Sequence, residues 1–406
     1  MVALDVILNK HMTRTTIETL GQRLIKRMKA QSLKGIPIAD KQHPRDNYQT
    51  HQIREMMMKS SFGPGDSLQD ESHLLSETEK SRLPTPKTVK RRLERTGVDQ
   101  MTAKINEWTV RKLKNISFRF GGKKLFFAAD RHDEPWYGDI ENENIKGGKR
   151  KSSTSYFWGT LGLYLVHPIR TLLVAVHPIR RNETEAEVFL KIIKELKQLF
   201  DKLHNFVLLG DGKYYRTDLI RYLNGQNYDY IIRAHRRGAV KKWADSPRSA
   251  ELDKNRGYIN KHRLSSQKYG KADTSIVIVN RDDDIIALAT SLTRYGATRV
   301  LEWYRRRFRI ENCFRDMRPF LIRTSSPDPR IRFAYIFFAM ILLNLIQLLL
   351  LEGVSVTDWA LGVFVECEQK QLLVAIHTYQ NWSWIKFWIE GVRKGNRRRW
   401  YHVQLL

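Results

Sequence analysis

Between residues 123 and 235 the chain alternates short apolar runs with turn-forming residues, a pattern typical of strands buried on both faces of a sheet. The pattern predicts five strands: KKLFFAAD, SYFWGTLGLYLV, TLLVAVHPI, NFVLLGD and YDYIIRAH. The first of them ends at Asp130 and the fourth ends at Asp211. Each of these aspartates therefore follows directly on an apolar run.

Two segments between the strands have the apolar spacing of amphipathic helices instead. Within residues 182–201, one side of the predicted helix carries Val188, Ile192, Leu196 and Leu199. Asn182 with Glu185 predicts the capped start of this helix. A second helix follows Asp211. Strands and helices in this order predict an α/β core with a mixed sheet.

The polar residues 236–281 interrupt this core and contain one strand-like run, TSIVIV, which predicts a β-rich insertion. The strand pattern returns in DDIIALATSL, and residues 297–321 then predict a long Arg-rich helix. These changes of pattern divide the chain into three parts: residues 1–118, 119–353 and 354–406. The middle part holds the α/β core, and the first and last parts are expected to be helical and basic.

Charge suggests the partner. The 71 Lys and Arg against 43 Asp and Glu leave a formal charge of +28, which favours a polyanion, with nucleic acid as the first candidate. An anionic membrane would predict basic residues gathered beside a lipid anchor or spanning helix, whereas here they run from Arg14 to Arg399. Two widely separated cysteines exclude a disulfide framework. The first residues lack the pattern of a secretory signal, so we expect a cytoplasmic protein.

Residues 336–351, IFFAMILLNLIQLLLL, form a long apolar run that a hydropathy scan would flag. The run is shorter than the roughly 20 apolar residues of a spanning helix, and it contains Asn344 and Gln347. We expect a helix buried in a protein core, with a membrane helix as the alternative.

A basic helix in the N-terminal region is a candidate for DNA contact. The segment TPKTVKRRLERTG contains an N-cap threonine, a proline for the first helical position and a glycine for the stop: Thr85, Pro86 and Gly97. Lys87, Arg91 and Arg95 recur every four residues, as a helix lying in a DNA groove would require. A solvated basic face is the alternative interpretation, because this spacing is weakly specific.

Asp130 and Asp211 stand at the ends of buried strands, a costly place for unpaired charge. A pair of Mg²⁺ ions would compensate, because hard divalent cations bind carboxylate oxygens and keep positions open for phosphate and water. The alternative is that both aspartates cap loops or begin turns. Asp133 is the rival to Asp130, which we prefer because it directly ends the apolar run.

A third carboxylate lies in the Arg-rich helix, within EWYRRRFRIENCFRDMR. At about 100° per residue, four polar residues fall in a stripe roughly 60° wide: Tyr304, Arg307, Glu311 and Arg318. Glu311 could complete a metal site there, and the guanidinium groups could hold phosphate oxygens. An ordinary charged helix is the alternative.

These residues resemble a known family. The YREK group of insertion-sequence transposases, the insertion-sequence-four type, has an RNase H-like catalytic core and a signature of Tyr, Arg, Glu and Lys. In this signature two residues separate Tyr from Arg, three separate Arg from Glu and six separate Glu from Lys. This chain has YRRRFRIENCFRDMR, with Arg318 in place of the lysine, which preserves charge but not shape. The resemblance also includes AADRHDEPWYG, LLGDGKYY, the polar insertion and the later apolar helix, and it covers about residues 123–353.

The resemblance implies an RNase H-like mixed β-sheet flanked by helices, and a DDE transposase that cuts DNA at the terminal inverted repeats of an element and joins it to target DNA. The catalytic residues, as ligands of two Mg²⁺ or Mn²⁺ ions, would be Asp130, Asp211 and Glu311. The contacts to phosphates at the element ends would be Tyr304, Arg307 and Arg318. We expect a homodimer in the DNA complex, near the nucleoid of a prokaryotic cell.

Three other functions stay open at this point. An RNase H-like nuclease without transposition would share the three carboxylates but would not need Tyr304 and Arg307. A DNA-binding regulator would use the basic N-terminal helices and would need no carboxylates. An inactive copy of a transposase would keep the motif but fail in folding or in DNA binding. Metal-dependent cleavage separates the regulator from the two active enzymes.

Overall fold

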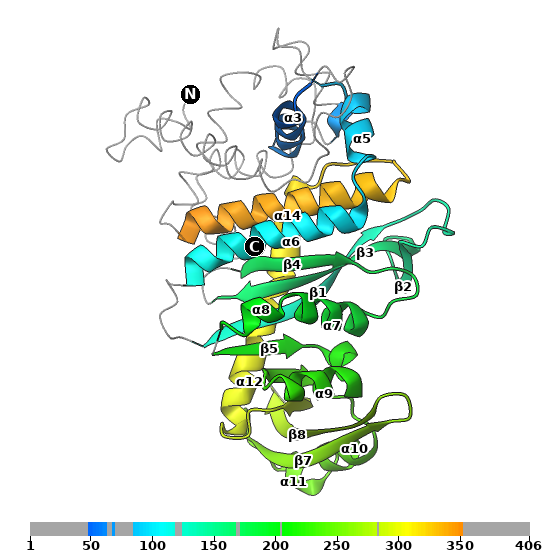
Figure 1. Ribbon diagram of the computed structural model, residues 1–406. Coiled ribbons are helices and arrows are strands. Elements are labelled where there is room, and N and C mark those ends of the chain that lie inside the picture. Colours follow the sequence, from blue (N-terminus) through cyan, green and yellow to red (C-terminus); the bar gives the residue numbers. More distant parts are fainter. Residues whose placement is uncertain are drawn as a thin grey trace, which may run out of the picture. The chain divides into compact units, whose positions relative to one another are not determined.

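The structure is a computed structural model that describes residues 48–62, 67–69, 84–117, 124–167, 171–203, 205–281 and 284–351 (Figure 1). These residues belong to two compact units. The sheet unit is Thr109–Cys313, and the helical unit combines residues from Met1–Trp108 and Phe314–Leu406. The helical C-terminal part predicted at residues 354–406, and the predictions for residues 1–47, lie outside the described residues.

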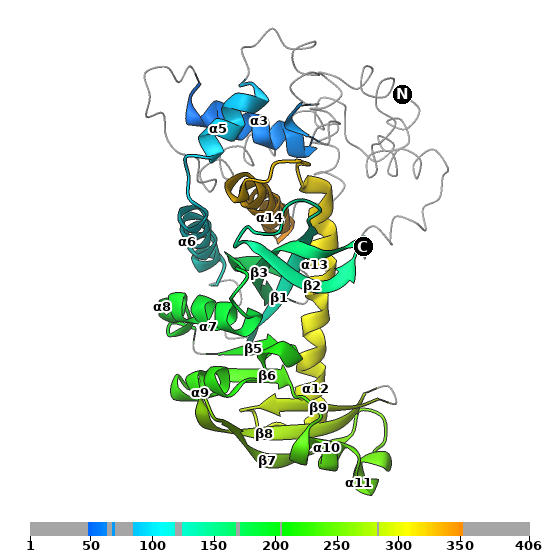
Figure 2. The same ribbon diagram turned by 90° about the vertical axis from the view of Figure 1, so that its right-hand side faces the viewer.

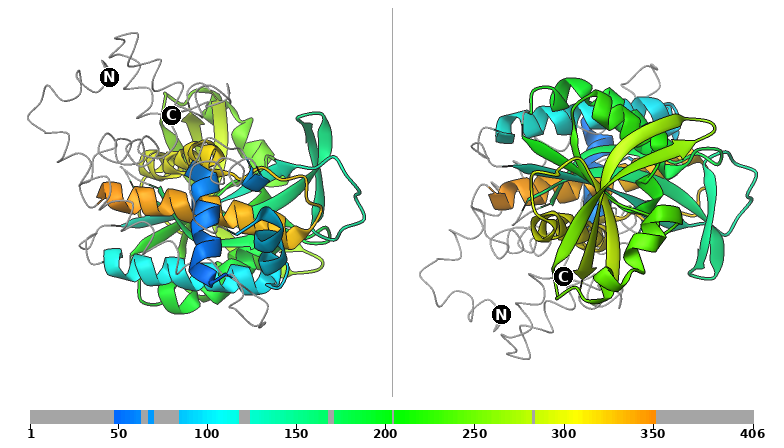
Figure 3. Two further views of the ribbon diagram at one scale, coloured as in Figure 1. Left: turned by 90° about the horizontal axis from the view of Figure 1, so that it is seen from above. Right: turned by 90° about the horizontal axis from the view of Figure 1, so that it is seen from below.

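The sheet unit contains one sheet of nine strands in its described residues. In chain order these are β1 (Leu125–Pro135), β2 (Ile145–Lys151), β3 (Thr154–Val166), β4 (Thr171–Pro178), β5 (Phe206–Gly210), β6 (Asp229–Arg233), β7 (Gly257–Ser266), β8 (Gly270–Arg281) and β9 (Asp284–Thr290). Their order across the sheet is β2-β3-β1-β5-β6-β9-β8-β7, with β4 also paired to β3. The pairs β1–β5 and β5–β6 are parallel and the other pairs are antiparallel, so the predicted mixed sheet is confirmed. Viewed end on, the strands turn progressively across the sheet (Figure 3), as the normal strand twist requires.

The five strands predicted from apolar runs are β1, β3, β4, β5 and β6. Two further strands, β2 and β7, were not expected, because their side chains are mostly polar and largely accessible. Both begin or end the order of strands across the sheet, where a strand needs only one pairing partner. The predicted insertion at residues 236–281 contributes β7 and β8 to one edge of the sheet, together with α10 (Gly238–Ala244) and α11 (Pro247–Ala250).

Helices cover both faces of the sheet around β1. On one side lie α7 (Glu185–Glu195), α8 (Lys197–Phe200) and α9 (Thr217–Gly225), and on the other side lies α12 (Ala297–Arg305) (Figure 2). Alternation along β1 puts the Phe127 ring 5.3 Å from that of Phe200 in α8. The next-door Phe126 ring is 5.6 Å from Trp303 in α12. Even-numbered residues of β1 therefore face α12, and odd-numbered residues face α7 and α8.

The start of α7 differs from the prediction. Its N-cap is Thr184, whose Oγ1 accepts from the amide of Glu187, while Glu187 Oε2 accepts from the amide of Thr184. The predicted pair of Asn182 with Glu185 was wrong because Thr184 and Glu187 form this reciprocal capping box two residues later. Glu185 is consequently the first helical residue and is buried.

β1 does not end at Asp130, as was expected from its apolar run. The strand continues to Pro135 because residues from Phe127 onward pair antiparallel with β3. The parallel pairing with β5 does stop earlier, at Ala128 opposite Leu209. Asp130 therefore lies inside β1, just beyond the point where β5 stops pairing with it.

The Arg-rich segment is helical from Ala297 to Phe320, as predicted, but two 3₁₀ helices interrupt its regular α-helical turns. After α12 come the 3₁₀ helix η3 (Arg306–Phe308), α13 (Arg309–Met317) and the 3₁₀ helix η4 (Arg318–Phe320). A 3₁₀ helix turns about 120° per residue, against about 100° in an α-helix. Three such residues shift the later side chains by about 60° around the axis, the whole width of the predicted stripe.

The helical unit contains α3 (Thr50–Phe62), α5 (Pro86–Leu93), the first part of α6 (Val98–Ser117) and α14 (Pro329–Leu351). Thr85 is the N-cap of α5, with its Oγ1 accepting from the amide of Thr88, and Pro86 is the first helical residue, as predicted. The helix ends at Leu93 rather than at Gly97. The Gly97 carbonyl instead accepts from the amide of Met101 in the first turn of α6.

The apolar segment at residues 336–351 is helical, as predicted, and forms most of α14. Its side chains from Ile336 to Leu345 are buried. Across the described residues, helix length and apolarity together fall short of what a membrane crossing requires.

Candidate active site

Asp130 and Asp211 lie at the same level of two adjacent parallel strands. Ala128 of β1 pairs with Leu209 of β5, and each aspartate is the second residue beyond this pair. Asp211 keeps an extended backbone and is the N-cap of the 3₁₀ helix η2 (Gly212–Tyr214). Paired residues of parallel strands point to the same face, so this register directs both aspartates to the side covered by α12.

The Asp130 carboxyl group resists ionisation. Burial, aided by the nearby negative charges of Asp211 and Glu185, raises its pKa from 3.8 to about 6, although the Arg131 amide and the Arg307 guanidinium act in the opposite direction. Its side chain is 23% exposed, so one side of the group is accessible. Repulsion between two carboxylates in a partly buried place is the condition that a bound cation would relieve.

Arg307 and Tyr304 accompany the aspartates on the same side of the sheet. Arg307 Nη1 lies 4.0 Å from Asp130 Oδ2, and the Arg307 side chain is only 10% exposed. The guanidinium is held among aromatic rings, 4.9 Å from the centroid of Phe308 and 5.9 Å from that of Tyr304. Burial raises the pKa of Tyr304, with a further contribution from the charge of Asp211. The predicted neighbours Asp130, Asp211, Tyr304 and Arg307 are thus brought together.

Asp133, the rival to Asp130, belongs to a different environment. As an odd-numbered residue of β1 it points to the opposite face, and it accepts from Arg131 Nε at 2.5 Å. Arg131 also lies 3.3 Å from Glu185 of α7. Asp133 is therefore engaged on the α7 side, which supports Asp130 as the ligand.

Glu311 and Arg318 are both exposed, whereas Tyr304 and Arg307 are buried. Glu311 follows η3 on α13, so the 3₁₀ turn rotates its side chain relative to Tyr304 of α12. Arg318 lies in η4 and belongs to the helical unit. Within the described part of the chain there is no group of three His, Cys, Asp or Glu side chains arranged to hold a metal ion. The structure thus brings two of the three predicted ligands together and leaves Glu311 outside that group.

The residues present fit a divalent metal ion in part. The two aspartates offer only carboxylate oxygens, the donors that Mg²⁺ and Mn²⁺ prefer. Burial raises the pKa of Asp130 despite the nearby Arg307, and a divalent ion bound between the two aspartates would stabilise the ionised carboxylate. Asp130 and Asp211 are accordingly the residues that could hold the metal, and Glu311 is the predicted third.

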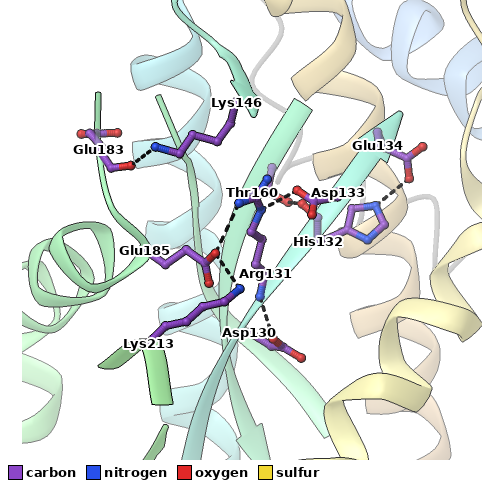
Figure 4. Close-up of polar contacts among 10 residues, drawn as sticks. All are labelled: Asp130, Arg131, His132, Asp133, Glu134, Lys146, Thr160, Glu183, Glu185 and Lys213. Carbon is purple, nitrogen blue, oxygen red and sulfur yellow. Dashed lines mark hydrogen bonds and ion pairs between the residues drawn. The ribbon is translucent and has the colours of Figure 1, made fainter. Parts of the chain in front are cut away.

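Four functional neighbours were missed from the sequence: Arg131, Glu185, Lys213 and Tyr214. Figure 4 shows Arg131 and Lys213 approaching Glu185 from β1 and from η2. The Tyr214 hydroxyl is buried and has no hydrogen-bond partner among the described residues. Burial, with the charges of Glu185, Asp211 and Asp130, raises its pKa well above its ordinary value. The only signal in the sequence was the position of Arg131, Lys213 and Tyr214 within three residues of the two aspartates.

The basic residues predicted to contact DNA at the N-terminal helix are all exposed. Lys87 and Arg91 lie on α5, and Arg95 follows its C-cap, Glu94. Their neighbour Arg92 is buried instead and donates to Thr50 Oγ1 at 3.0 Å. The exposed side of α5 therefore carries the predicted cations, while its other side anchors it to α3.

Comparisons with known proteins identify the family and the fold of this chain. The model of the transposase DDE domain family matches residues 121–345, more than half of the 406-residue chain. Among solved structures, the chain is similar to a piggyBac transposase in a cryo-EM structure of its synaptic complex with hairpin DNA. The two share 8% sequence identity with a TM-score of 0.51, over 91% of this chain and 82% of that one. This likeness shows the fold alone, and it confirms the RNase H-like α/β architecture. No curated protein matches the sequence. The matched segment contains both strands that carry the aspartates and the whole Tyr304-to-Glu311 region, so the chain belongs to the transposase DDE domain family.

Proposed function

We propose that this protein is a cut-and-paste DNA transposase of the insertion-sequence-four type, with Asp130, Asp211 and Glu311 as its catalytic carboxylates. It would cleave DNA at the terminal inverted repeats of an element and join the freed 3′ ends to target DNA. The observation that carries the proposal is the placement of Asp130 and Asp211 at one level of adjacent strands, with Arg307 4.0 Å from Asp130. A regulator that only bound DNA would not need this costly arrangement.

Asp130 and Asp211 would bind two Mg²⁺ or Mn²⁺ ions together with Glu311. When bound, such ions neutralise charge on the phosphate and activate the attacking oxygen. Glu311 is exposed at the first turn of α13, four residues after Arg307, and is accessible to a DNA end. We propose that Glu311 joins the two aspartates when DNA is bound.

The protein's own cations would position the DNA strand. Arg307, held between aromatic rings beside Asp130, would donate to a phosphate oxygen next to the bond that is cut. Tyr304, buried beside it, would keep the guanidinium in place and share this contact. Arg318, in place of the lysine of the YREK signature, would reach a phosphate further along the strand.

A second set of contacts would come from the helical unit. The exposed Lys87, Arg91 and Arg95 would bind the phosphates of the terminal repeat, and the net charge of +28 supports DNA as the partner. The similar piggyBac structure is itself a complex with DNA. We further propose that two copies act together on a pair of ends, close to the nucleoid in the cytoplasm of a prokaryotic cell.

The proposal is tested with labelled duplexes that contain the inverted repeats found beside the gene. The wild-type protein should nick or cut these duplexes at the repeat boundary in Mg²⁺ or Mn²⁺, and should not cut a duplex with a scrambled repeat. Asp211→Asn should abolish cleavage and keep DNA binding, since it removes one negative charge from the ligand set. Binding without any metal-dependent cleavage by the wild-type protein would instead favour a regulator or an inactive copy.

A further inference from the structure

Each of the two aspartates is held by the backbone amide of a residue that follows it closely. Asp130 Oδ1 accepts from the amide of Arg131 at 2.9 Å, and Asp211 Oδ1 accepts from the amide of Lys213 at 2.9 Å. One oxygen of each carboxylate is thus fixed by a neutral donor. The other oxygen, Oδ2, is the one that lies nearest Arg307 in Asp130.

The side chains of these same two residues meet at a single carboxylate. Lys213 Nζ donates to Glu185 Oε1 at 2.8 Å, and Arg131 Nη1 donates to the same oxygen at 3.3 Å (Figure 4). Glu185 is 9% exposed and stands at the first position of α7. One buried charge on a helix therefore ties together the two segments whose amides hold the aspartates.

Building on the proposed function, we infer that Glu185 is a positioning residue for the metal site. By binding Arg131 and Lys213 at one oxygen, it holds β1 and η2 so that the Asp130 and Asp211 carboxylates keep a fixed separation. It also holds the Lys213 side chain away from Asp211, where this cation would compete with a divalent ion. Glu185 itself touches neither the metal nor the DNA in this role.

Removal of the Glu185 charge has a direct electrostatic consequence. Arg131 would keep only Asp133 as an ion-pair partner, and Lys213 would lose the carboxylate that its side chain binds. Arg131 would stay with Asp133 on the α7 side, whereas Lys213 follows Asp211 by two residues and would be left beside the Asp211 carboxylate. Lys213 would turn toward Asp211 and lower the affinity for a divalent ion, and β1 and η2 would no longer be tied together, which would loosen the carboxylate geometry.

A purely structural role for Glu185 is the competing explanation, because an acidic residue in the first turn stabilises a helix. Such a role predicts lower stability of α7 without a specific effect on metal affinity. Glu195 at the other end of the same helix provides a matched control. It is hydrogen-bonded to His177 Nε2 at 2.7 Å, on the same side of the sheet but away from Arg131 and Lys213.

The test measures Mn²⁺ binding to the full chain without DNA, by the loss of the free-ion signal in electron paramagnetic resonance. We expect Glu185→Gln to weaken Mn²⁺ binding by about 10- to 100-fold, the usual effect of losing a residue that supports a metal ligand. Glu195→Gln should leave the affinity within about twofold of the wild type. Thermal unfolding in EDTA shows whether each variant is folded.

Lys213→Met serves as the second variant, because its side chain is 58% exposed and its backbone amide is kept. It should weaken Mn²⁺ binding in the same direction and by a smaller factor. Equal affinities of the wild type and a folded Glu185→Gln, or equal losses in Glu185→Gln and Glu195→Gln, overturn the inference. If the wild type binds Mn²⁺ with these differences but cuts no DNA, the proposed transposase function fails while the role of Glu185 stands.

Discussion

Arg307 Nη1 lies 4.0 Å from Asp130 Oδ2, which joins the Arg-rich segment to the first strand of the sheet. The arginine is buried among aromatic rings and directed toward a carboxylate that is itself hard to ionise. A guanidinium in this place partly compensates the carboxylate in the absence of metal. In the proposed function, a bound divalent ion would take over this compensation, and the same group would be available to hold a phosphate oxygen.

Replacing Arg307 by Ala should weaken binding of the element end and lower the slope of log affinity against log salt by at most roughly 0.9, the share of one phosphate. Cleavage should fall further than binding, because the strand is no longer oriented beside Asp130. The measurement is a binding and cleavage series from low to high salt with one labelled duplex.

Arg299→Ala is the control for this change, since Arg299 lies on α12, is 60% exposed and pairs with Glu302. It should leave cleavage unchanged and should alter the salt slope little. Equal effects of the two substitutions would show that Arg307 acts only through general charge.

Metal affinity should depend on pH through Asp130. Its pKa is raised to about 6, so below that pH a proton occupies the carboxyl group in the metal-free protein and competes with the ion. We expect the apparent Mn²⁺ affinity to fall about tenfold per pH unit below about pH 6 and to be nearly constant from pH 7 to 8. Binding that stays constant down to pH 5 would contradict the raised pKa.

Metal affinity should rise with pH, whereas the free energy of unfolding of the metal-free protein should fall as pH rises. A carboxyl group whose pKa is raised on folding stabilises the fold fully below its ordinary pKa of 3.8, and this contribution is lost as pH rises to about 6. At pH 8, Asp130→Asn should therefore raise the resistance of the metal-free protein to denaturant, by on the order of 1 to 3 kcal/mol. Asp133→Asn should give no such gain, because Asp133 forms an ion pair with Arg131. A lower denaturant midpoint for Asp130→Asn than for the wild type in EDTA would show that the ionised Asp130 carboxylate does not destabilise the metal-free protein.

Much of the sheet was predictable because its central strands are buried on both faces and carry continuous apolar runs. The same logic singled out Asp130 and Asp211, which the register of β1 and β5 places at one level, although β1 continues past Asp130. The edge strands β2 and β7 escaped prediction because polar side chains suffice where a strand has one neighbour.

The helix that carries Glu311 shows a second limit of sequence patterns. A regular period of 3.6 residues placed Glu311 beside Tyr304 and Arg307, but the 3₁₀ turn η3, which contains Arg307 and lies between Tyr304 and Glu311, changes the rotation per residue. Glu185 was interpreted only as a capping residue with Asn182, because its partners Arg131 in β1 and Lys213 in η2 are far from it in the sequence. Only the folded chain brings these three side chains together.

The exposed cations of α5 and its following turn should contribute to DNA affinity and not to the chemistry. Replacing Lys87, Arg91 and Arg95 by Ala should lower the slope of log affinity against log salt by up to about 2.7, at about 0.9 for each phosphate. Cleavage at saturating DNA should stay close to that of the wild type. The control removes three lysines of α7 and α8 by the same substitution: Lys191, Lys194 and Lys197. A triple α5 variant that matches this control in slope and affinity would remove α5 from the DNA interface.

The proposed catalytic site needs three carboxylates to hold its metal ions, and Glu311 is the one that the structure does not group with the two aspartates. Glu311→Gln keeps the size of the side chain and removes its negative charge. In Mg²⁺, cleavage of the element-end duplex by this variant should fall by orders of magnitude, while its DNA affinity in EDTA stays nearly unchanged because affinity comes from many Lys and Arg. Full cleavage by Glu311→Gln would exclude Glu311 from the metal site and contradict the assignment of three catalytic carboxylates.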